Sequence, residues 1–141
     1  MMKLRIIAVG KIKSKPVKDL VGEYASRLVH YFPTERIDAK DEKAAIKMID
    51  KGDHLVVCDE NGQQKTSPEL ANLFSMYERR RIKRVVFFIG GPEGVGAEMK
   101  KRADYALALS KMTFPHEMAQ AILLEQIYRA ATILKGEAYH K

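Results

Sequence analysis

The first candidate for chemistry is a glycine-rich loop in the second half of the chain, Gly90-Gly91-Pro92-Glu93-Gly94-Val95-Gly96. It follows a very hydrophobic stretch and precedes a helical pattern, a position at which α/β sheets bind ligands. Its glycines let a ligand approach the backbone closely. The loop lacks the Gly-Lys-Ser/Thr ending of a P-loop and the glycine order of a dinucleotide fingerprint. A plain glycine-rich turn between strand and helix explains the pattern equally well.

The C-terminal residues Tyr139, His140 and Lys141 form a second candidate, because they combine an aromatic ring, an imidazole and a cation. Upstream, Glu125 and Arg129 stand four residues apart, in the order that favours an ion pair on one helix face. Arg129 could equally point at a ligand. By composition alone, a short polar tail of this kind is expected to fray.

Two runs of cations could contact phosphate groups. The denser run places five cations within six residues: Arg79, Arg80, Arg81, Lys83 and Arg84. Residues 1–18 carry six cations and no acid, and the whole chain has a net charge of +7. An anionic partner such as nucleic acid suits this balance. Charge runs are usually solvated faces, and that alternative stays open.

The length of 141 residues and the hydrophobic content of 46% predict one domain, residues 1–141, with a single core. No apolar stretch approaches the roughly 20 residues that a membrane-spanning helix needs, and Met1–Gly10 lacks the pattern of a signal peptide. We therefore expect a soluble, cytoplasmic protein. The single cysteine, Cys58, excludes an intramolecular disulfide, and the four histidines show no metal-ligand spacing, so no metal is expected.

Alternating strand and helix patterns predict an α/β fold with a mainly parallel sheet and helices on both faces. Apolar runs predict strands at Lys3–Val9, Arg36–Ala39, His54–Asp59, Arg84–Ile89 and Tyr105–Leu109. Helical spacing and capping signals predict helices over Val17–Leu28, Asp41–Lys51, Ala97–Ala103 and Glu117–Lys135, and a further helix with Ser67 as its N-cap and Pro68 in its first turn.

Two details of these elements can be predicted more closely. The Asn61-Gly62 pair is a turn signal after the third strand. The last helix carries 12 apolar residues among the 17 from Met118 to Leu134, so it should be covered on more than one side, and Gly136 fits its C-cap.

Four ordered motifs carry a resemblance to a known family: Ile89-Gly90-Gly91-Pro92-Glu93-Gly94, Leu109-Ser110-Lys111-Met112-Thr113-Phe114-Pro115-His116, Leu124-Glu125-Gln126-Ile127-Tyr128-Arg129-Ala130 and Gly136-Glu137-Ala138-Tyr139-His140-Lys141. The chain resembles the ribosomal RNA large subunit methyltransferase H family, a SPOUT group acting on N3 of a pseudouridine in the helix 69 loop of 23S rRNA. The resemblance implies a C-terminal trefoil knot, a homodimer, S-adenosylmethionine as cofactor and the assembled ribosome as substrate.

The resemblance also implies roles for individual residues. Cofactor contacts fall on Cys58, Gly90, Leu109, Ser110, Lys111, Met112, Thr113 and Phe114, and a side chain at Gly90 would occupy cofactor space. His140 is the candidate for removing the N3 proton or binding the base, Tyr139 for stacking, and Arg129 for supplying positive charge. Candidate RNA contacts are Lys141, His116, Arg79, Arg80 and Arg81.

This sequence departs from the family pattern at three positions. Gln120 stands where many relatives carry an arginine, and it cannot supply that charge. Cys58 replaces a frequent leucine, and Ala138 replaces a frequent proline. The alternative function is a non-catalytic RNA-binding protein with a degenerate methyltransferase fold. A nucleotide-dependent oxidoreductase is disfavoured because the dinucleotide fingerprint is missing.

Overall fold

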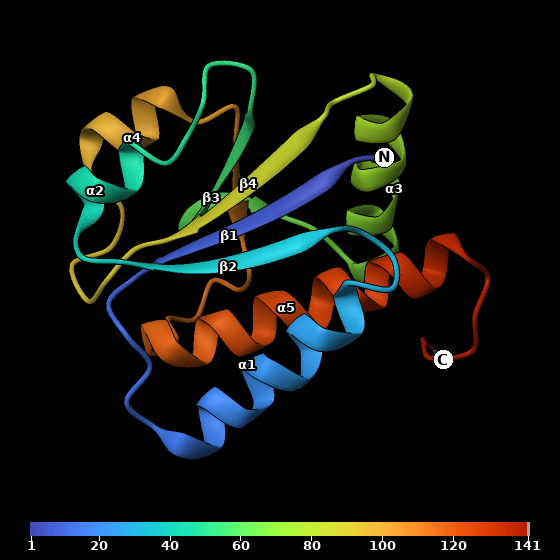
Figure 1. Cartoon of the computed structure of the whole chain (residues 1–141), viewed down its shortest axis with the longest axis horizontal. Helices are drawn as coiled ribbons and strands as arrows, with labels where there is room; N and C mark the ends of the chain where they lie inside the picture. Colours follow the sequence, from blue (N-terminus) through green and yellow to red (C-terminus); the bar gives the residue numbers. More distant parts are fainter. Residues whose placement is uncertain (141) are drawn as a thin grey trace.

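A computed structural model describes residues 1–140 and contains one five-stranded sheet in the order β2-β1-β4-β3-β5, with all neighbouring strands parallel (Figure 1). The strands are β1 (Lys3–Val9), β2 (Thr34–Ala39), β3 (His54–Gln64), β4 (Arg84–Ile89) and β5 (Tyr105–Ala108). Parallel strands need crossover connections, and each is supplied by at least one helix. The predicted α/β class with a parallel sheet is confirmed.

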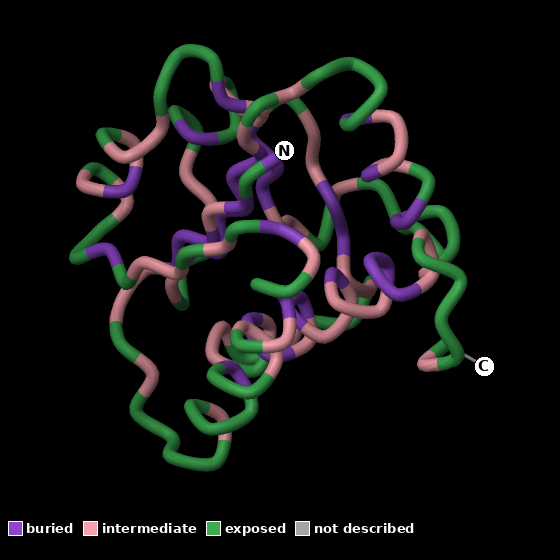
Figure 2. The backbone as a smooth tube through the Cα atoms, turned by 45° about the vertical axis from the view of Figure 1, so that its right-hand side comes forward, coloured by how far each residue is buried: buried purple, intermediate pink, exposed green. Residues whose placement is uncertain are grey.

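Five helices cover the two faces of the sheet. On one face lie α1 (Lys15–Leu28), α3 (Ser67–Arg79) and α5 (His116–Leu134), and on the other lie α2 (Glu42–Ile46) and α4 (Ala97–Arg102). Side chains alternate along each strand, so Ile6 joins the core beneath α1, α3 and α5 whereas Ile7 joins the core beneath α2 and α4. Figure 2 shows the buried residues along the strands and the exposed ones in the outer loops and turns.

The last helix, α5, is enclosed by α1, α3 and the sheet, which explains its apolar composition. Leu123, Leu124 and Ile127 are fully buried in this layer. The prediction that this helix is covered on more than one side is confirmed within a single chain. Its end is a Schellman motif: Gly136 has φ +69°, and the Glu137 N–H donates to the Thr132 carbonyl at 2.9 Å.

The predicted turn at Asn61-Gly62 is wrong, because β3 continues through both residues to Gln64. Its pairing with β5 shifts between Cys58 and Gln63, which both pair with Leu107, so the residues between them interrupt the regular ladder. Gly62 is required at this position for a different reason: a Cβ here would lie 2.6 Å from the Ala106 carbonyl oxygen. Close approach of two backbones, rather than a turn, requires Gly62.

Several boundaries also differ from the prediction. Thr66, and not Ser67, is the N-cap of α3, since its hydroxyl accepts from the Glu69 N–H and the Glu69 carboxylate accepts from the Thr66 N–H in a capping box. The second helix, α2, is much shorter than the predicted range 41–51, and β2 begins at Thr34 rather than at Arg36.

The predicted trefoil knot stays a prediction. No helix in the described part of the chain is long and apolar enough to cross a membrane.

Candidate functional site

A cavity of about 530 Å³ opens at the carboxyl ends of the strands, where parallel α/β sheets bind their ligands. Three segments and the first turn of α5 form its wall. The lining residues are Cys58, Asp59 and Glu60 after the core of β3, Ile89 to Val95 after β4, Leu109, Ser110 and Met112 to Pro115 after β5, and His116 and Ala119 on α5. The volume lies within the range of small-molecule sites.

The glycine-rich loop forms one wall of this cavity by folding on itself. Gly94 has φ +80°, and its N–H donates to the Gly91 carbonyl at 2.9 Å. A Cβ at Gly90 would lie 2.3 Å from the Gly94 carbonyl oxygen. The tight turn of the loop itself therefore requires Gly90, and the expectation that a side chain here would also occupy cofactor space stays a prediction.

The opposite wall is the segment between β5 and α5, which is neither helix nor strand. Two side-chain bonds hold it: the Met112 N–H donates to Ser110 Oγ at 3.0 Å, and Thr113 Oγ1 donates to Glu60 Oε2 at 2.5 Å. Irregular backbone of this kind can present N–H and C=O groups to a ligand.

Most of the predicted cofactor residues come together at this cavity. Its lining includes Cys58, Gly90, Leu109, Ser110, Met112, Thr113 and Phe114. Lys111 instead lines a neighbouring polar hollow with Asn61 and Gln63. His116, predicted as an RNA contact, lines the main cavity.

Sequence reasoning missed the acidic side of the cavity. Asp59, Glu60 and Glu93 line it although the chain is strongly basic overall, so this hollow suits a ligand with positive charge. Asp59 also pairs with Lys100 at 3.3 Å. Burial raises the pKa of the Cys58 thiol to about 12, so the thiol stays neutral. The signal for Asp59 and Glu60 was their position directly after the apolar run Leu55–Cys58.

The C-terminal tail is docked on α5, contrary to the expected fraying. Tyr139 Oη donates to Glu125 Oε2 at 2.8 Å, and Arg129 donates to the same oxygen from Nη2 at 2.7 Å. The Arg129 guanidinium lies 4.9 Å from the centre of the Tyr139 ring, and its Nη1 donates to His140 Nδ1 at 3.1 Å. The predicted ion pair between Glu125 and Arg129 is confirmed, and the three predicted catalytic residues lie together.

Tyrosines from α1 and α5 complete this docking. The Tyr128 and Tyr139 rings meet edge to face at 4.7 Å, and Tyr24 Oη lies 3.5 Å from Tyr139 Oη. Burial, and then the hydrogen bonds with Tyr24 and Glu125, raise the pKa of Tyr139, so its hydroxyl stays protonated as a donor. Tyr31 donates to Glu137 at 2.6 Å; this bond, with burial, raises the pKa of Tyr31 to about 12.

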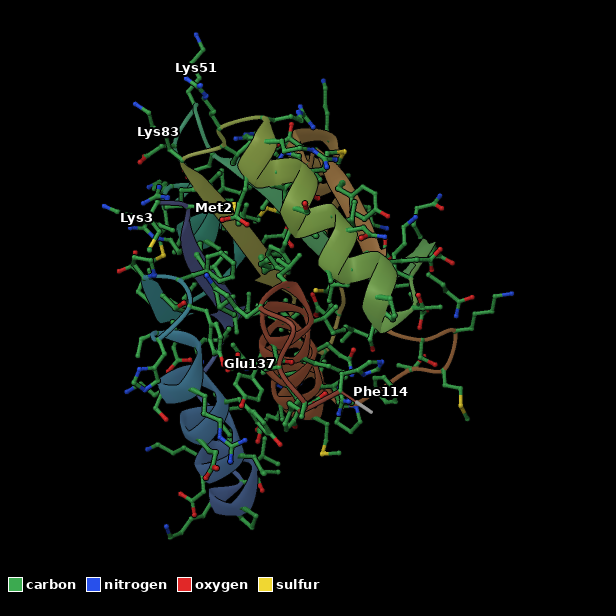
Figure 3. The ribbon with its side chains drawn as sticks, turned by 90° about the vertical axis from the view of Figure 1, so that its right-hand side faces the viewer. Met2, Lys3, Lys51, Lys83, Phe114 and Glu137 are labelled. Atoms are coloured by element: carbon green, nitrogen blue, oxygen red, sulfur yellow. The ribbon has the colours of Figure 1, made fainter. Side chains whose placement is uncertain are left out.

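The predicted RNA-binding arginines lie at the amino ends of the strands, away from the cavity. Six exposed cations from separate segments gather there and are called the cationic edge: Lys3, Lys51, Arg79, Arg80, Arg81 and Lys83. Figure 3 shows Lys3, Lys51 and Lys83 at one end of the molecule, and the Lys3 N–H donates to the Lys83 carbonyl at 2.9 Å. Arg81 has φ +59°, a conformation usually taken by glycine after a helix.

The cavity and the docked tail are separate within one chain. α5 begins at the cavity with His116 and runs back across the sheet to the tail (Figure 1). Arg129 stands thirteen residues after His116, which at 1.5 Å per residue is about 20 Å. The structure thus leaves apart two groups of candidate residues, the cavity lining and the docked tail, which are called the half-sites.

The departure at Gln120 has a structural explanation. Gln120 is 1% exposed, and its Oε1 accepts from Arg36 Nη1 at 2.8 Å. Arg36 of β2 therefore brings a guanidinium to this position, and Gln120 is a packing residue rather than a phosphate contact.

Lys141, a predicted RNA contact, lies outside the described residues. Among residues 1–140 no group of His, Cys, Asp and Glu is arranged to hold a metal ion.

Comparison with known proteins agrees with this geometry. A family described as Predicted SPOUT methyltransferase matches residues 2–140. Ribosomal RNA large subunit methyltransferase H from Geobacter metallireducens is 42% identical over 152 residues, with 99% of each chain covered. The protein of that name from Coprothermobacter proteolyticus is 42% identical over 140 residues, covering 99% of this chain and all of its own. The chain belongs to the ribosomal RNA large subunit methyltransferase H family.

Two solved structures share the fold of this family member. A probable methylase family protein from Haemophilus influenzae Rd KW20 matches 98% of this chain and 70% of its own, with 13% identity and a TM-score of 0.59. The SpoU methyltransferase AviRb from Streptomyces viridochromogenes, in complex with the cofactor AdoMet, matches 96% of this chain and 59% of its own, with 11% identity and a TM-score of 0.52.

Proposed function

We propose that this protein transfers a methyl group from S-adenosylmethionine to N3 of a pseudouridine in the helix 69 loop of 23S rRNA, within the assembled ribosome. The observation that carries the proposal is the cavity at the strand ends, formed by the glycine-rich loop and the Leu109–Pro115 segment that also carry the family motifs. Membership of a family whose named members are ribosomal RNA large subunit methyltransferases supports the choice of substrate.

The residues of the cavity fit S-adenosylmethionine. Leu109 and Phe114 offer apolar cover for an adenine ring, and the irregular backbone around them offers groups for its polar edge. The negative charges of the Asp59, Glu60 and Glu93 carboxylates would balance the positive charges of the cofactor's ammonium and sulfonium groups. When bound, this cofactor supplies an electrophilic methyl group. The sulfur keeps the electron pair of the carbon–sulfur bond when the methyl group is transferred.

The protein's own tasks are to hold the nucleobase and to help its N3–H proton leave. The target base must be unstacked, at a cost of a few kcal/mol that is smaller in a loop. Tyr139 provides a ring for stacking, and Arg129 and His140 lie next to it on the tail. As N3 forms its bond to the methyl carbon, the N3 proton passes to water or to a protein base.

A homodimer would unite the two half-sites. About 20 Å separates His116 from Arg129 along α5, so one chain's tail does not serve its own cavity. A second copy can supply it if a two-fold axis brings the two α5 helices together in antiparallel orientation. Met112 and Met118, 75% and 43% exposed near the cavity, offer apolar surface for such a contact.

The cationic edge is the proposed contact for the ribosomal RNA backbone. Its six side chains come from three segments, so the fold adds Lys3 and Lys51 to a run of cations at 79–83 that is already dense in the sequence. Phosphate contacts of this kind position a nucleic acid without reading its sequence.

The deciding experiment follows methyl transfer from labelled S-adenosylmethionine to ribosomes, isolated large subunits and naked rRNA that lack only this methyl group. Incorporation into intact ribosomes at one loop pseudouridine is the expected result. Cofactor binding without transfer to any of the three would move the search to another RNA. Failure to bind the cofactor would favour the non-catalytic RNA-binding alternative.

A further inference from the structure

Glu125 accepts the hydrogen bonds that hold the docked tail on α5. Its Oε2 accepts from Tyr139 Oη at 2.8 Å and from Arg129 Nη2 and Nε at 2.7 and 3.1 Å, while its Oε1 accepts from Gln126 at 2.9 Å. Both carboxylate oxygens are therefore bonded, and the Glu125 and Arg129 side chains are only 19% and 25% exposed. This arrangement fixes the orientation of the Arg129 guanidinium.

The orientation of Arg129 decides which ring nitrogen of His140 carries a proton. A guanidinium has only N–H donors and no acceptor. Because Arg129 Nη1 lies 3.1 Å from His140 Nδ1, that nitrogen must accept the hydrogen bond and be unprotonated. In the neutral imidazole the proton then sits on Nε2. Nε2 is consequently a hydrogen-bond donor, and Nδ1 can take a proton only by giving up Arg129.

We infer that His140 donates a hydrogen bond from Nε2 to a carbonyl oxygen of the nucleobase and does not remove its N3 proton. Arg129 and Glu125 are positioning residues that hold His140 in this tautomer. The inference rests on the proposed function and changes one of its roles, since sequence alone had left His140 as a candidate base. The partner recognised is a nucleobase with a carbonyl next to an N–H, as in an imide.

This donor role gives His140 a specific effect on the transfer. When the N3 proton leaves to water, the negative charge that remains is shared with the adjacent carbonyl oxygens. A donor placed at such an oxygen stabilises that charge. The N3 electron pair then bonds the methyl carbon while the carbon–sulfur pair stays on sulfur, so no proton is stored on the protein.

The tautomer can be observed without any reaction. We would record the ¹⁵N resonances of the His140 ring in isotope-labelled protein at about pH 8, above the usual titration range of histidine, and assign them with His140→Gln. The expected result is a ring protonated wholly at Nε2 in the wild type and in Arg129→Lys, and a mixture of tautomers in Arg129→Met. A proton on Nδ1 in the wild type, or the same mixture in all three proteins, would overturn the inference.

Two substitutions separate a donor from a base in the reaction. His140→Gln places an amide N–H near the position of Nε2, whereas His140→Asn places its amide near Nδ1, and neither can act as a base. In single-turnover transfer to ribosomes we expect His140→Gln to stay within about tenfold of the wild type and His140→Asn to fall about a hundredfold. Equal, large losses in both variants with an active wild type would refute the donor role alone, whereas an inactive wild type would refute the proposed function as well.

Discussion

Two inactive variants should restore activity when they are combined in one dimer, because cavity and tail are separated within each chain. The first variant, Gly90→Val, damages the cavity, since even a Cβ at this position lies 2.3 Å from the Gly94 carbonyl oxygen. The second, Tyr139→Ala with His140→Ala, removes the tail contacts with Glu125 and Arg129. Each homodimer is expected to be inactive.

The expected recovery follows from the distance between the half-sites. About 20 Å along α5 separates each tail from the cavity of its own chain, so in the proposed homodimer each site combines one chain's cavity with the other chain's tail. In a heterodimer of the two variants, one site receives both damaged parts and the other receives both intact parts. The heterodimer should therefore recover about half of the wild-type activity per dimer, as two-fold symmetry requires.

The assay uses co-expressed chains with two different affinity tags, so that only heterodimers are purified. Methyl transfer to ribosomes and cofactor binding by calorimetry are then measured, with about one cofactor expected per heterodimer. A pair of chains that both carry the tail substitutions is the control and should stay inactive. A heterodimer as inactive as its parents would refute the shared site, and an active tail variant would refute a role for the tail.

Thr66→Ala should lower the free energy of unfolding by about 1 kcal/mol in urea titration and leave methyl transfer unchanged, because the hydrogen bond from the Glu69 N–H to the Thr66 hydroxyl is lost. An unchanged midpoint of urea unfolding would show that the cap does not stabilise the protein. Arg84→Met should cost about 2 kcal/mol near neutral pH, since it strands the buried Asp53 carboxylate, which Arg84 contacts at 2.6 and 2.8 Å. Burial alone would raise the pKa of Asp53, but the hydrogen bonds from Arg84 hold this pKa below its usual range. The stabilisation from the pair is therefore present above the unfolded-state pKa of Asp53 and is lost as the pH falls through its folded-state pKa. The difference between variant and wild type should therefore shrink on acidification, and a constant difference would contradict the pairing. Replacing Arg79, Arg80 and Arg81 by Gln should reduce the slope of log affinity for ribosomes against log salt by about 2.

The arginine triple needs a control of equal charge. Lys40, Lys43 and Lys47 are exposed around α2 and do not belong to the cationic edge, and their replacement by Gln removes the same three charges. This control should leave the salt slope nearly unchanged. Equal slopes for the two triples would assign the arginines to a solvated face.

Local sequence patterns predicted the elements well wherever one short segment contains the signal. The strands Lys3–Val9 and Arg84–Ile89 appear with the predicted bounds, because a run of apolar residues reports burial on both faces of a parallel sheet. Gly136 ends the last helix as expected. The pattern failed at Gly62, where the glycine is required by a neighbouring backbone that is 44 positions away at Ala106.

The sequence by itself determined the fold class, the family and the segments that form the cavity, since these depend on short motifs and on the alternation of strands and helices. Only the tertiary structure decided how the side chains are used. It placed Arg36 against Gln120, docked Tyr139 on Glu125, and set Arg129 on the Nδ1 atom of His140. Each of these contacts joins separate segments, and a local pattern carries no information about which segments the sheet order and helix packing bring together.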